Sequence, residues 1–421
     1  MELNVHNIAR VKDAKIEINS ITVVAGENSS GKSTISKALY SILDGYNDGI
    51  AQIIIQKRKS KRKVVSDFLR SKIDFRVNTA GLVRVIINIE RILNTTSSKE
   101  GVVVKIRNLF DKNNLIDFFT IQDIEQLYNS YNEVEERKID FYFDYVSQTI
   151  LDGIFGKQIN CLKNQSKGYI QIIDENRKQT IEVQNNKVQN LSENNYIEMK
   201  YKPIYISTSD LIDMVGTYKK LYSAQKSDSI SYANLKLTQL LMNEIDKNNL
   251  VAEEYHKIEE QKSILNDIYQ QVLDGEIHLE NKELVYWDNW CKANIELTNV
   301  ASGMKIFLLL QRLINNGTFL QPVCLIIDEP ESNQHPRWQL VLAKLLVLLS
   351  KRLDVKVYLN SHSPYFVRAI EYYAHEYKML DDCRFYTMLP DGELGLYSSK
   401  DVTNQLGIIY DKLAEPFNEI M

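Results

Sequence analysis

Nine consecutive residues near the N-terminus have the types and the spacing needed to hold a polyphosphate. Residues 26–34 read Gly-Glu-Asn-Ser-Ser-Gly-Lys-Ser-Thr, which is a P-loop pattern. Its glycines allow successive backbone N–H groups to turn toward phosphate oxygens. The lysine can reach the β- and γ-phosphates, and the serine after it can bind Mg²⁺. The residues that we predict to bind ATP are Gly26, Asn28, Ser29, Ser30, Gly31, Lys32, Ser33 and Thr34.

The segments on either side of this loop support the interpretation. An apolar run, Ile21–Ala25, precedes the loop, and a helical pattern over residues 35–43 follows it. This strand-loop-helix setting places the positive end of a helix dipole beside the phosphates. The alternative is a serine-rich loop with an accidental lysine, which would need neither the strand nor the helix.

A pair of carboxylates far along the chain could complete the site. The apolar segment Val323–Ile327 runs into Asp328, Glu329, Pro330 and Glu331. A buried parallel strand that ends in two carboxylates is typical of a Walker B element. We predict that Asp328 supports the metal ion and that Glu329 is the general base that polarises the attacking water. Taken alone, the segment could be a polar turn that ends a core strand.

Two further segments, one with a histidine and one with a Ser-Gly pair, indicate which class of P-loop protein this is. His362 follows the predicted strand 355–359 and could donate a hydrogen bond to a γ-phosphate, whereas the alternative is a solvated loop histidine. Ser302 and Gly303 open an apolar helix predicted over residues 306–314, and a small-residue turn at a helix N-terminus is another anion site. The alternative for Ser302 is a plain N-cap.

The composition is that of an ordinary soluble protein. A chain of 421 residues with 44% apolar residues can form two or three domains, each with a core. The net charge of -4 gives no general reason to expect nucleic acid or an anionic membrane as a partner. The four cysteines lack metal-ligand spacing and are expected to be reduced thiols. We therefore expect a cytoplasmic protein that neither spans nor binds a membrane.

The motifs divide the chain into five regions. The head is expected in three pieces: residues 1–45 with the P-loop, a β-lobe over 165–210, and 276–421 with the other motifs. Helical insertions are predicted over 46–164 and 211–275. Patterns within these regions predict helices over 82–93, 121–136 and 402–420, a strand over 384–388, and a hairpin over 276–286 that turns at residues 281–282.

The regions between the motifs leave some questions open. Short strands over 169–173, 180–183 and 196–206 are interpreted as the antiparallel β-lobe. The amphipathic stretch 232–272 could form one helix of about 60 Å or a folded helical pair. The basic run Lys57–Lys63 carries six positive charges in seven residues. It could grip a nucleic-acid backbone, or it could be a solvated helix face.

The order of P-loop, Ser-Gly signature, Walker B strand and switch histidine resembles the ABC-type ATPases. Within that class, the chain is similar to the OLD-like group, distant relatives of the SMC and DNA-repair ATPases. The stretches that carry the resemblance are residues 6–13, 301–303, 328–336 and 361–365. The signature is not the Leu-Ser-Gly-Gly-Gln of transporters, and Gln334 stands where a leucine is usual before His335 and Pro336.

The resemblance implies an α/β fold: an ABC-type P-loop ATPase head with a mixed sheet core, an antiparallel β-lobe and helical insertions. It also implies a homodimer or a higher oligomer of heads, in which Ser302 and Gly303 of one head close over the nucleotide of the other. Asn333 and His335 would line the loop between the heads. A glutamine that touches Mg²⁺ belongs to the pattern, and this sequence does not reveal its position.

The resemblance further implies a biological role. OLD-like ATPases without a nuclease domain resemble the ATPase subunits of phage-defence systems such as PARIS or Septu, in which a separate partner supplies the nuclease. The 57 residues after Pro364 are too few for a Toprim-type nuclease domain. We therefore expect a nucleotide-gated switch or scaffold subunit with a separately encoded effector. The alternative is an SMC-like ATPase for DNA maintenance or repair that clamps DNA. A transporter ATPase fits poorly, because Gly303 lies far beyond the usual distance from the P-loop.

Overall fold

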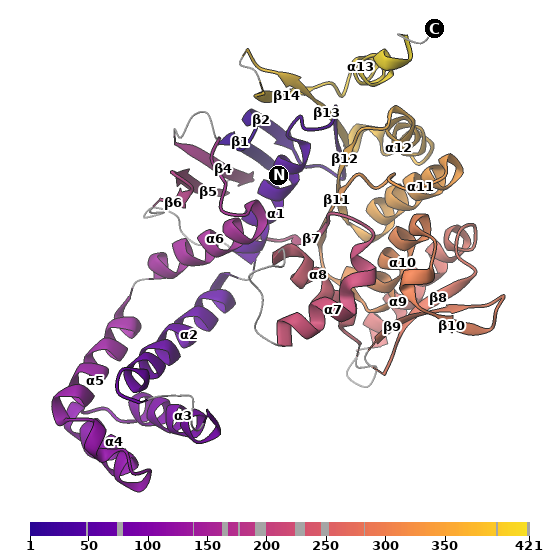
Figure 1. Ribbon diagram of the computed structural model, residues 1–421. Coiled ribbons are helices and arrows are strands. Elements are labelled where there is room, and N and C mark those ends of the chain that lie inside the picture. The colour runs from indigo at the N-terminus through magenta and orange to yellow at the C-terminus, as the bar shows by residue number, and fades with distance from the viewer. Residues whose placement is uncertain are drawn as a thin grey trace. The chain divides into compact units, whose positions relative to one another are not determined.

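The computed structural model describes residues 1–47, 49–73, 79–137, 139–161, 167–175, 177–189, 199–223, 232–245, 252–281, 283–392 and 395–418. These residues form two compact units (Figure 1). The first unit comprises residues 1–47 and 147–421, and the second is the single continuous segment 48–146. All the sequence motifs described above lie in the first unit, apart from the basic run.

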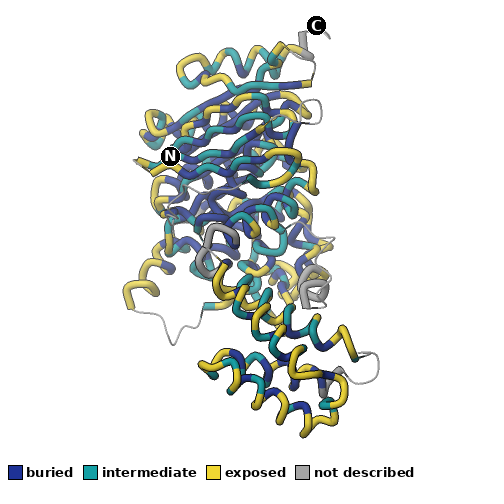
Figure 2. The backbone as a smooth tube through the Cα atoms, turned by 90° about the vertical axis from the view of Figure 1, so that its left-hand side faces the viewer, coloured by how far each residue is buried: buried dark blue, intermediate teal, exposed yellow. Residues whose placement is uncertain are grey.

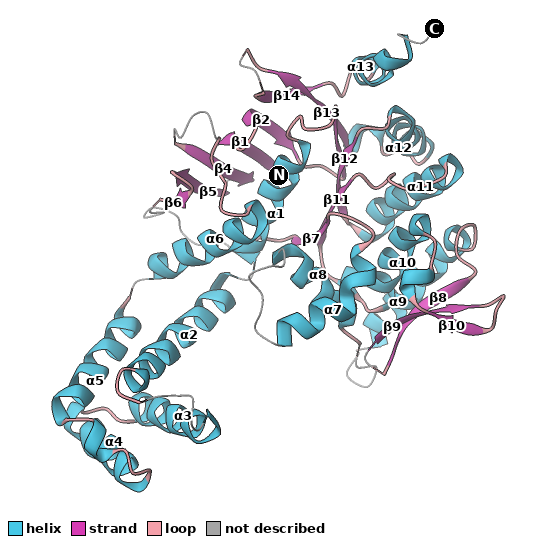
Figure 3. Cartoon of the chain, in the orientation of Figure 1, coloured by secondary structure: helices cyan, strands magenta, loops and turns pink. Residues whose placement is uncertain are grey.

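An eleven-stranded mixed sheet is the centre of the first unit, in the order β6-β5-β4-β1-β2-β14-β13-β3-β12-β11-β7. Five neighbouring strands at one end of the sheet are parallel to one another (Figure 3). They are β13 (Cys383–Pro390), β3 (Ile21–Ala25), β12 (Lys356–Ser361), β11 (Val323–Asp328) and β7 (Lys202–Ile206). Because their carboxyl ends meet at one edge, the residues after β3, β11 and β12 lie close together. The P-loop and the Walker B segment are therefore neighbours.

The other end of the sheet is antiparallel. It comprises β1 (Glu2–Ile8), β2 (Val11–Glu17), β4 (Gly168–Asp174), β5 (Arg177–Gln184) and β6 (Lys187–Val188). Strand β14 (Tyr397–Asp401) joins the two ends, since it pairs with β13 and with β2. This confirms the α/β fold class with a mixed sheet core, an antiparallel lobe and helical insertions.

One strand was assigned to the wrong part of the sheet. The segment 196–206 was expected in the antiparallel lobe, but β7 is the outermost parallel strand and pairs with β11. Its run of buried side chains fits a parallel strand that is covered on both faces. Residues 196–198 lie outside the described part of the chain. The correction matters because it brings the end of β7 to the edge where the motifs meet.

Helices flank the parallel strands, whose side chains are almost entirely buried (Figure 2). The helices around the motifs are α1 (Lys32–Asn47), α10 (Ser302–Asn315), α11 (Pro336–Leu353) and α12 (Pro364–Glu376). The insertion after β7 contains α7 (Leu211–Ser223), α8 (Tyr232–Met242) and α9 (Ala252–Tyr269). Helices α8 and α9 are separate, so the stretch 232–272 does not form one long helix.

A small antiparallel sheet precedes α10. It consists of β8 (Gly275–Glu280), β9 (Glu283–Asp288) and β10 (Ala293–Ile295). Strands β8 and β9 form the predicted hairpin, and one of its two turn residues, Lys282, lies outside the described residues. A short 3₁₀ turn, Leu297–Asn299, leads from this sheet to Ser302.

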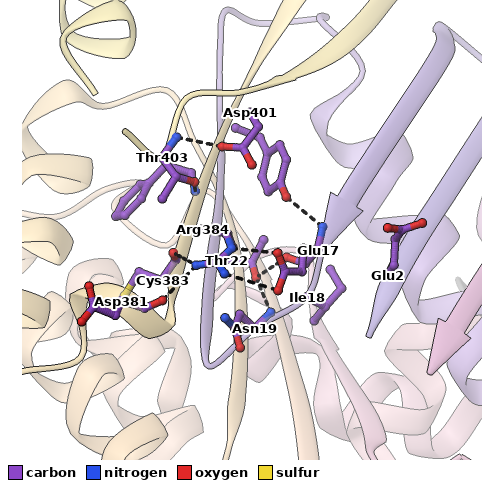
Figure 4. A network of polar contacts seen from close by, with 12 residues as sticks. Glu2, Glu17, Ile18, Asn19, Thr22, Asp381, Cys383, Arg384, Asp401 and Thr403 are labelled. Carbon is purple, nitrogen blue, oxygen red and sulfur yellow. Dashed lines mark hydrogen bonds and ion pairs between the residues drawn. The ribbon is translucent and has the colours of Figure 1, made fainter. Parts of the chain in front are cut away.

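The C-terminal segment is attached to the N-terminal strands by a polar network (Figure 4). The guanidinium of Arg384 on β13 forms an ion pair with Glu17 at 2.8 Å and donates to the carbonyl oxygen of Asp381 at 2.9 Å. The backbone N–H of Glu17 donates a hydrogen bond to the hydroxyl oxygen of Tyr386 at 2.9 Å. The terminal helix α13 (Gly407–Asn418) begins five residues later than the predicted Val402, because the Val402 N–H still pairs with Phe385 O.

The second unit is helical, as predicted for the first insertion. It comprises α2 (Gly49–Arg70), α3 (Thr79–Thr95), α4 (Lys99–Lys112), α5 (Ile121–Glu136) and the beginning of α6 (Ile139–Phe155), which ends in the first unit. Helix α5 starts with a capping box between Thr120 and Asp123. Buried side chains such as Leu69, Ile89 and Phe110 give this unit a core of its own.

The basic run lies on α2, where it is partly neutralised. Lys57 and Lys61 both form ion pairs with Glu135 on α5. Their hydrogen bonds lower the pKa of the Glu135 carboxyl. Two of the six cations are thus engaged within the unit.

Two other sequence expectations concern the cysteines and the membrane. All four cysteines are free thiols, and Cys161, Cys324 and Cys383 are buried. Over the residues that the structure describes, we find no helix with the length and apolar character needed to cross a bilayer.

Candidate nucleotide site

The P-loop connects β3 to α1 through a backbone that only certain residues adopt readily. Gly31 has a φ of 92° and Ser29 a φ of 63°, both in the left-handed region. A Cβ atom on Gly31 would also come within 3.0 Å of a methyl carbon of Val11. Glycine is therefore required at position 31 both by its backbone conformation and by the close approach of β2. Asn28, Ser29 and Ser33 are exposed, whereas the Ser30 side chain is buried.

Lys32 is the first residue of α1, and its side chain is only 4% exposed. Its ammonium donates hydrogen bonds to the carbonyl oxygens of Gly26 at 2.8 Å and Glu27 at 2.7 Å. Burial lowers the pKa of Lys32, while the nearby carboxylates of Glu329 and Glu331 act in the opposite direction. The lysine thus sits inside the loop, next to the Walker B carboxylates, where phosphate oxygens would replace the backbone carbonyls as acceptors.

Asp328 ends β11 and is held by three neutral donors. Its Oδ1 accepts from the Ser36 hydroxyl at 2.8 Å and from the Asn360 amide at 2.6 Å. Its Oδ2 accepts from the Tyr205 hydroxyl at 2.7 Å. Burial, followed by the charge of Asp328, raises the pKa of Tyr205 well above its usual value, so the phenol stays a proton donor. The carboxylate is therefore oriented by side chains from α1, β12 and β7.

Glu329 lies one residue beyond the strand and turns toward solvent. Its φ of 48° is left-handed, and its N–H donates to the Asn360 carbonyl at 2.9 Å. Its side chain is 40% exposed, and its Oε1 lies 3.5 Å from Nδ1 of His362. The predicted general base and the predicted switch histidine are thus neighbours, although 33 positions separate them in the sequence.

A cavity of 360 Å³ lies at this edge of the sheet. Ser33 of the P-loop and Asp328, Glu329 and Asn333 of the Walker B region all line it. This brings the two predicted metal ligands, Ser33 and Asp328, and the predicted base Glu329 to one space in the size range of ligand pockets, whereas His362 is not part of its lining. The full lining is Ser33, Ile206, Ser207, Thr208, Ser209, Ile306, Ile327, Asp328, Glu329, Pro330, Ser332 and Asn333.

Three residues of this lining were missed by the sequence analysis. Ser207, Thr208 and Ser209 follow β7 and precede α7. They occupy the strand-to-helix junction beside the Walker B strand β11. In the sequence, these three residues form a polar turn directly after an apolar segment, which is the same pattern by which we predict Asp328.

The Ser-Gly signature begins α10 and contacts the Walker B region. A Cβ atom on Gly303 would come within 2.9 Å of the Asn333 carbonyl oxygen and 3.0 Å of the Trp338 ring. Ser302 itself is exposed, and Ile306, one turn further along, lines the cavity. Asn333 and His335 are also exposed, and His335 caps the start of α11. The signature is therefore fixed by its glycine, while its serine is directed to the surface.

Comparison with known proteins identifies the family. Residues 1–367 match the AAA ATPase domain family, so the chain belongs to this family. Membership implies binding of ATP and its hydrolysis to ADP and phosphate. A comparison with curated proteins gives no match.

Solved structures of SMC heads are similar at low sequence identity. The SMC head domain from Thermotoga maritima has 10% identity and a TM-score of 0.38, with 95% of this chain and 98% of that chain covered. An SMC head bound to the C-terminal winged-helix domain of ScpA has 10% identity and a TM-score of 0.42, with 97% and 98% covered. An SMC head with an extended coiled coil, bound to the C-terminal domain of ScpA derived from Pyrococcus furiosus, has 12% identity and a TM-score of 0.35, with 97% and 98% covered.

Proposed function

We propose that the chain is a Mg²⁺-dependent ATPase of the ABC type whose complete active site forms between two heads. The observation that carries this proposal is the common cavity of Ser33, Asp328 and Glu329, with His362 beside Glu329. In this assignment the P-loop residues bind the phosphates and Glu329 accepts a proton from the attacking water. His362 senses the γ-phosphate.

The residues at the site fit Mg²⁺. This ion takes few protein ligands and completes its shell with phosphate oxygens and water. The exposed Ser33 hydroxyl and the Asp328 carboxylate supply such oxygens, and no ready-made cluster of three or more His, Cys, Asp or Glu ligands occurs among the described residues. When bound, the ion would neutralise charge on the phosphates.

The exposure of Ser302 supports a site shared between two heads. Its neighbour Gly303 is packed against the Walker B loop of the same chain, so the serine is presented outward at a helix N-terminus. A second head would bring this N-terminus to a γ-phosphate held by the first. Asn333 and His335, exposed on the adjoining loop, would line the same interface. A homodimer is the smallest assembly in which both sites are complete.

The proposal is tested by three variants. Lys32→Ala should abolish binding of ATP, whereas Glu329→Gln should preserve binding and slow hydrolysis by about 10²- to 10⁴-fold. Glu329→Gln should also form a more persistent head pair than the wild type in ATP, measured by sedimentation. Ser302→Arg should block pairing and leave ATP bound to its own P-loop.

Equal ATP affinity in Lys32→Ala and wild type would contradict the phosphate assignment. A strictly monomeric Glu329→Gln protein with wild-type turnover would contradict the shared site.

For the biological role, we infer a cytoplasmic switch or scaffold subunit that controls a separately encoded effector, most simply a nuclease in phage defence. The support is the family resemblance of the motifs together with a helical unit that has its own core and is separate from the ATPase sheet. The runner-up is an SMC-like ATPase that clamps DNA. A pull-down with the product of the neighbouring gene discriminates the two: a nuclease supports the first role, and a recombination protein supports the second.

A further inference from the structure

Glu331 connects two loops that carry the chemistry. It lies two residues after Glu329, and its side chain is only 4% exposed. Its Oε1 accepts three hydrogen bonds from the last residue of β12 and the two residues that follow it. The donors are the Ser361 hydroxyl at 2.6 Å, the His362 N–H at 3.1 Å and the Ser363 N–H at 3.3 Å. One carboxylate oxygen thus ties the Walker B loop to the histidine loop.

A carboxylate in this position is costly for the fold. Burial raises the pKa of Glu331, and the hydrogen bond from Ser361 only partly offsets this effect. The second oxygen, Oε2, is buried and has no partner among the described residues. An apolar side chain would avoid both costs. The arrangement is therefore better explained by what Oε1 holds in place than by packing.

The hydrogen bonds to Glu331 influence the orientation of the His362 ring. Glu331 fixes the backbone N–H of His362, and the Nδ1 of the same residue lies 3.5 Å from Oε1 of Glu329 and 3.7 Å from Oε1 of Glu331. The neighbouring Ser363 is fixed as well, and its hydroxyl caps the first turn of α12 through Phe366 N at 3.2 Å. The histidine is thus held between an anchored backbone and a rigid helix start, with its ring beside the predicted base.

We propose that Glu331 is a positioning residue that holds the His362 loop in register with Glu329 by accepting three hydrogen bonds at Oε1. This rests on the proposed roles of Glu329 and His362 in hydrolysis. Glu331 itself touches no reacting atom in this assignment. Glu331 determines the position of His362, the proposed γ-phosphate sensor, relative to Glu329, the proposed base.

The test compares three variants with a matched control. Glu331→Gln keeps an acceptor oxygen at the same place, Glu331→Ala removes it, and Ser361→Ala removes the shortest of the three bonds. The control is Glu371→Ala on α12, a half-buried carboxylate that accepts from Tyr410 and pairs with Arg368 away from this cavity. Turnover, KM and the dissociation constant for ATP are measured for each, together with the melting temperature.

Glu331→Ala should lower kcat by about tenfold or more while the dissociation constant for ATP changes less than about threefold, because orientation and not binding is lost. Glu331→Gln should stay within about threefold of wild-type kcat. Ser361→Ala should lie between the two, and adding it to Glu331→Ala should cost little more, since both remove the same contact. Glu371→Ala should change only the melting temperature.

A measurement that does not depend on ATP hydrolysis separates the positioning role of Glu331 from the proposed roles of Glu329 and His362. The chain has six histidines, so the ring signals can be followed by NMR and His362 identified from a His362→Gln sample. Glu331→Ala should shift or broaden the His362 signal more than Glu331→Gln does, because Gln removes only the charge that lies 3.7 Å from Nδ1 whereas Ala also removes the acceptor that fixes the backbone. If Glu329→Gln hydrolyses ATP normally while the His362 signal still depends on Glu331, the proposed function fails and the positioning role stands.

Three outcomes would overturn the positioning role. The first is wild-type kcat in Glu331→Ala. The second is an equal loss of kcat in Glu331→Gln and Glu331→Ala, which would show that the negative charge of Glu331 matters and not its acceptor oxygen. The third is an unchanged His362 signal in Glu331→Ala. Should Glu331→Ala fail to fold, an unchanged His362 signal and wild-type kcat in Ser361→Ala would overturn the role equally.

Discussion

The hydroxyl of Tyr205 donates a 2.7 Å hydrogen bond to Oδ2 of Asp328, across 123 positions of sequence. The two residues lie on β7 and β11, which are adjacent parallel strands. We predict that Tyr205→Phe lowers kcat by about three- to tenfold, the effect of one lost hydrogen bond to a charged group. The dissociation constant for ATP should change less, since the P-loop is untouched.

The control for this prediction is Tyr358→Phe. Tyr358 is buried on the neighbouring strand β12, and its hydroxyl has no partner within the described part of the chain. Removing that hydroxyl should leave kcat unchanged and should not lower the melting temperature. Equal losses of kcat in the two variants would show that the Asp328 contact is unimportant.

Gly303 should be intolerant of even a small side chain. The Cβ of Gly303→Ala would lie 2.9 Å from a backbone oxygen, so the signature helix or the Asn333 loop must move. We expect a loss of about 1–3 kcal/mol in the free energy of unfolding and weaker ATP-driven pairing. Gly216→Ala on α7 is the control, because its Cβ would meet nothing within 4 Å. It should be neutral or stabilising in thermal unfolding.

The side chain of Gln334 is a buried amide with no partner for either polar atom among the described residues. Gln334→Leu should therefore raise the free energy of unfolding by about 1–3 kcal/mol, measured by denaturant titration. Gln261→Leu is the control, since that buried amide donates to the Phe319 carbonyl and its loss should not stabilise. If Gln334 is retained for contact with the second head, Gln334→Leu will weaken ATP-driven pairing while it stabilises the chain. A lower stability of Gln334→Leu would contradict this account.

Acidification should favour the wild type over Glu331→Gln. The folded-state pKa of Glu331 is raised by burial, so the folded protein binds a proton more readily than the unfolded chain. The contribution of Glu331 to the free energy of unfolding therefore increases as the pH falls through its pKa in the folded state. It levels off below its pKa in the unfolded state. Gln has no such dependence. Melting temperatures measured from pH 8 down to pH 4 should show the difference between the two proteins shifting toward the wild type, and a constant difference over this whole range would contradict a raised pKa of Glu331 in the folded protein.

Five of the six cations of the basic run should divide into two groups. Lys57 and Lys61 are paired with Glu135, whereas Arg58, Lys59 and Arg62 line a cavity of 670 Å³ and form no ion pair with a described carboxylate within 4.0 Å. Neutralising the second group should weaken any duplex DNA binding and reduce its salt slope by up to about three. Neutralising Lys57 and Lys61 should instead cost less than about 1 kcal/mol of stability. Tight, sequence-selective binding that survives both changes would favour the DNA-clamp role.

The success and failure of the sequence predictions have a common physical cause. The strand and helix around the P-loop and the strand before Asp328 could be predicted because each is specified by its immediate neighbours in the sequence, while the roles of the site residues stay predictions. The donors to Asp328 were not found, since Tyr205, Ser36 and Asn360 become its partners only through strand order. The strand that ends at Ile206 was placed in the wrong part of the sheet, because a short apolar segment does not reveal which strand it pairs with.

The second unit is one unbroken segment, residues 48–146, and its core is made by its own helices. The chain crosses between the units only twice, once in each direction. Such a segment can be lost, lengthened or exchanged between relatives without repacking the sheet or disturbing the ATPase motifs. Selection can therefore alter this segment independently of how the protein uses ATP, and lineages that share these motifs are expected to diverge most between the end of α1 and residue 146.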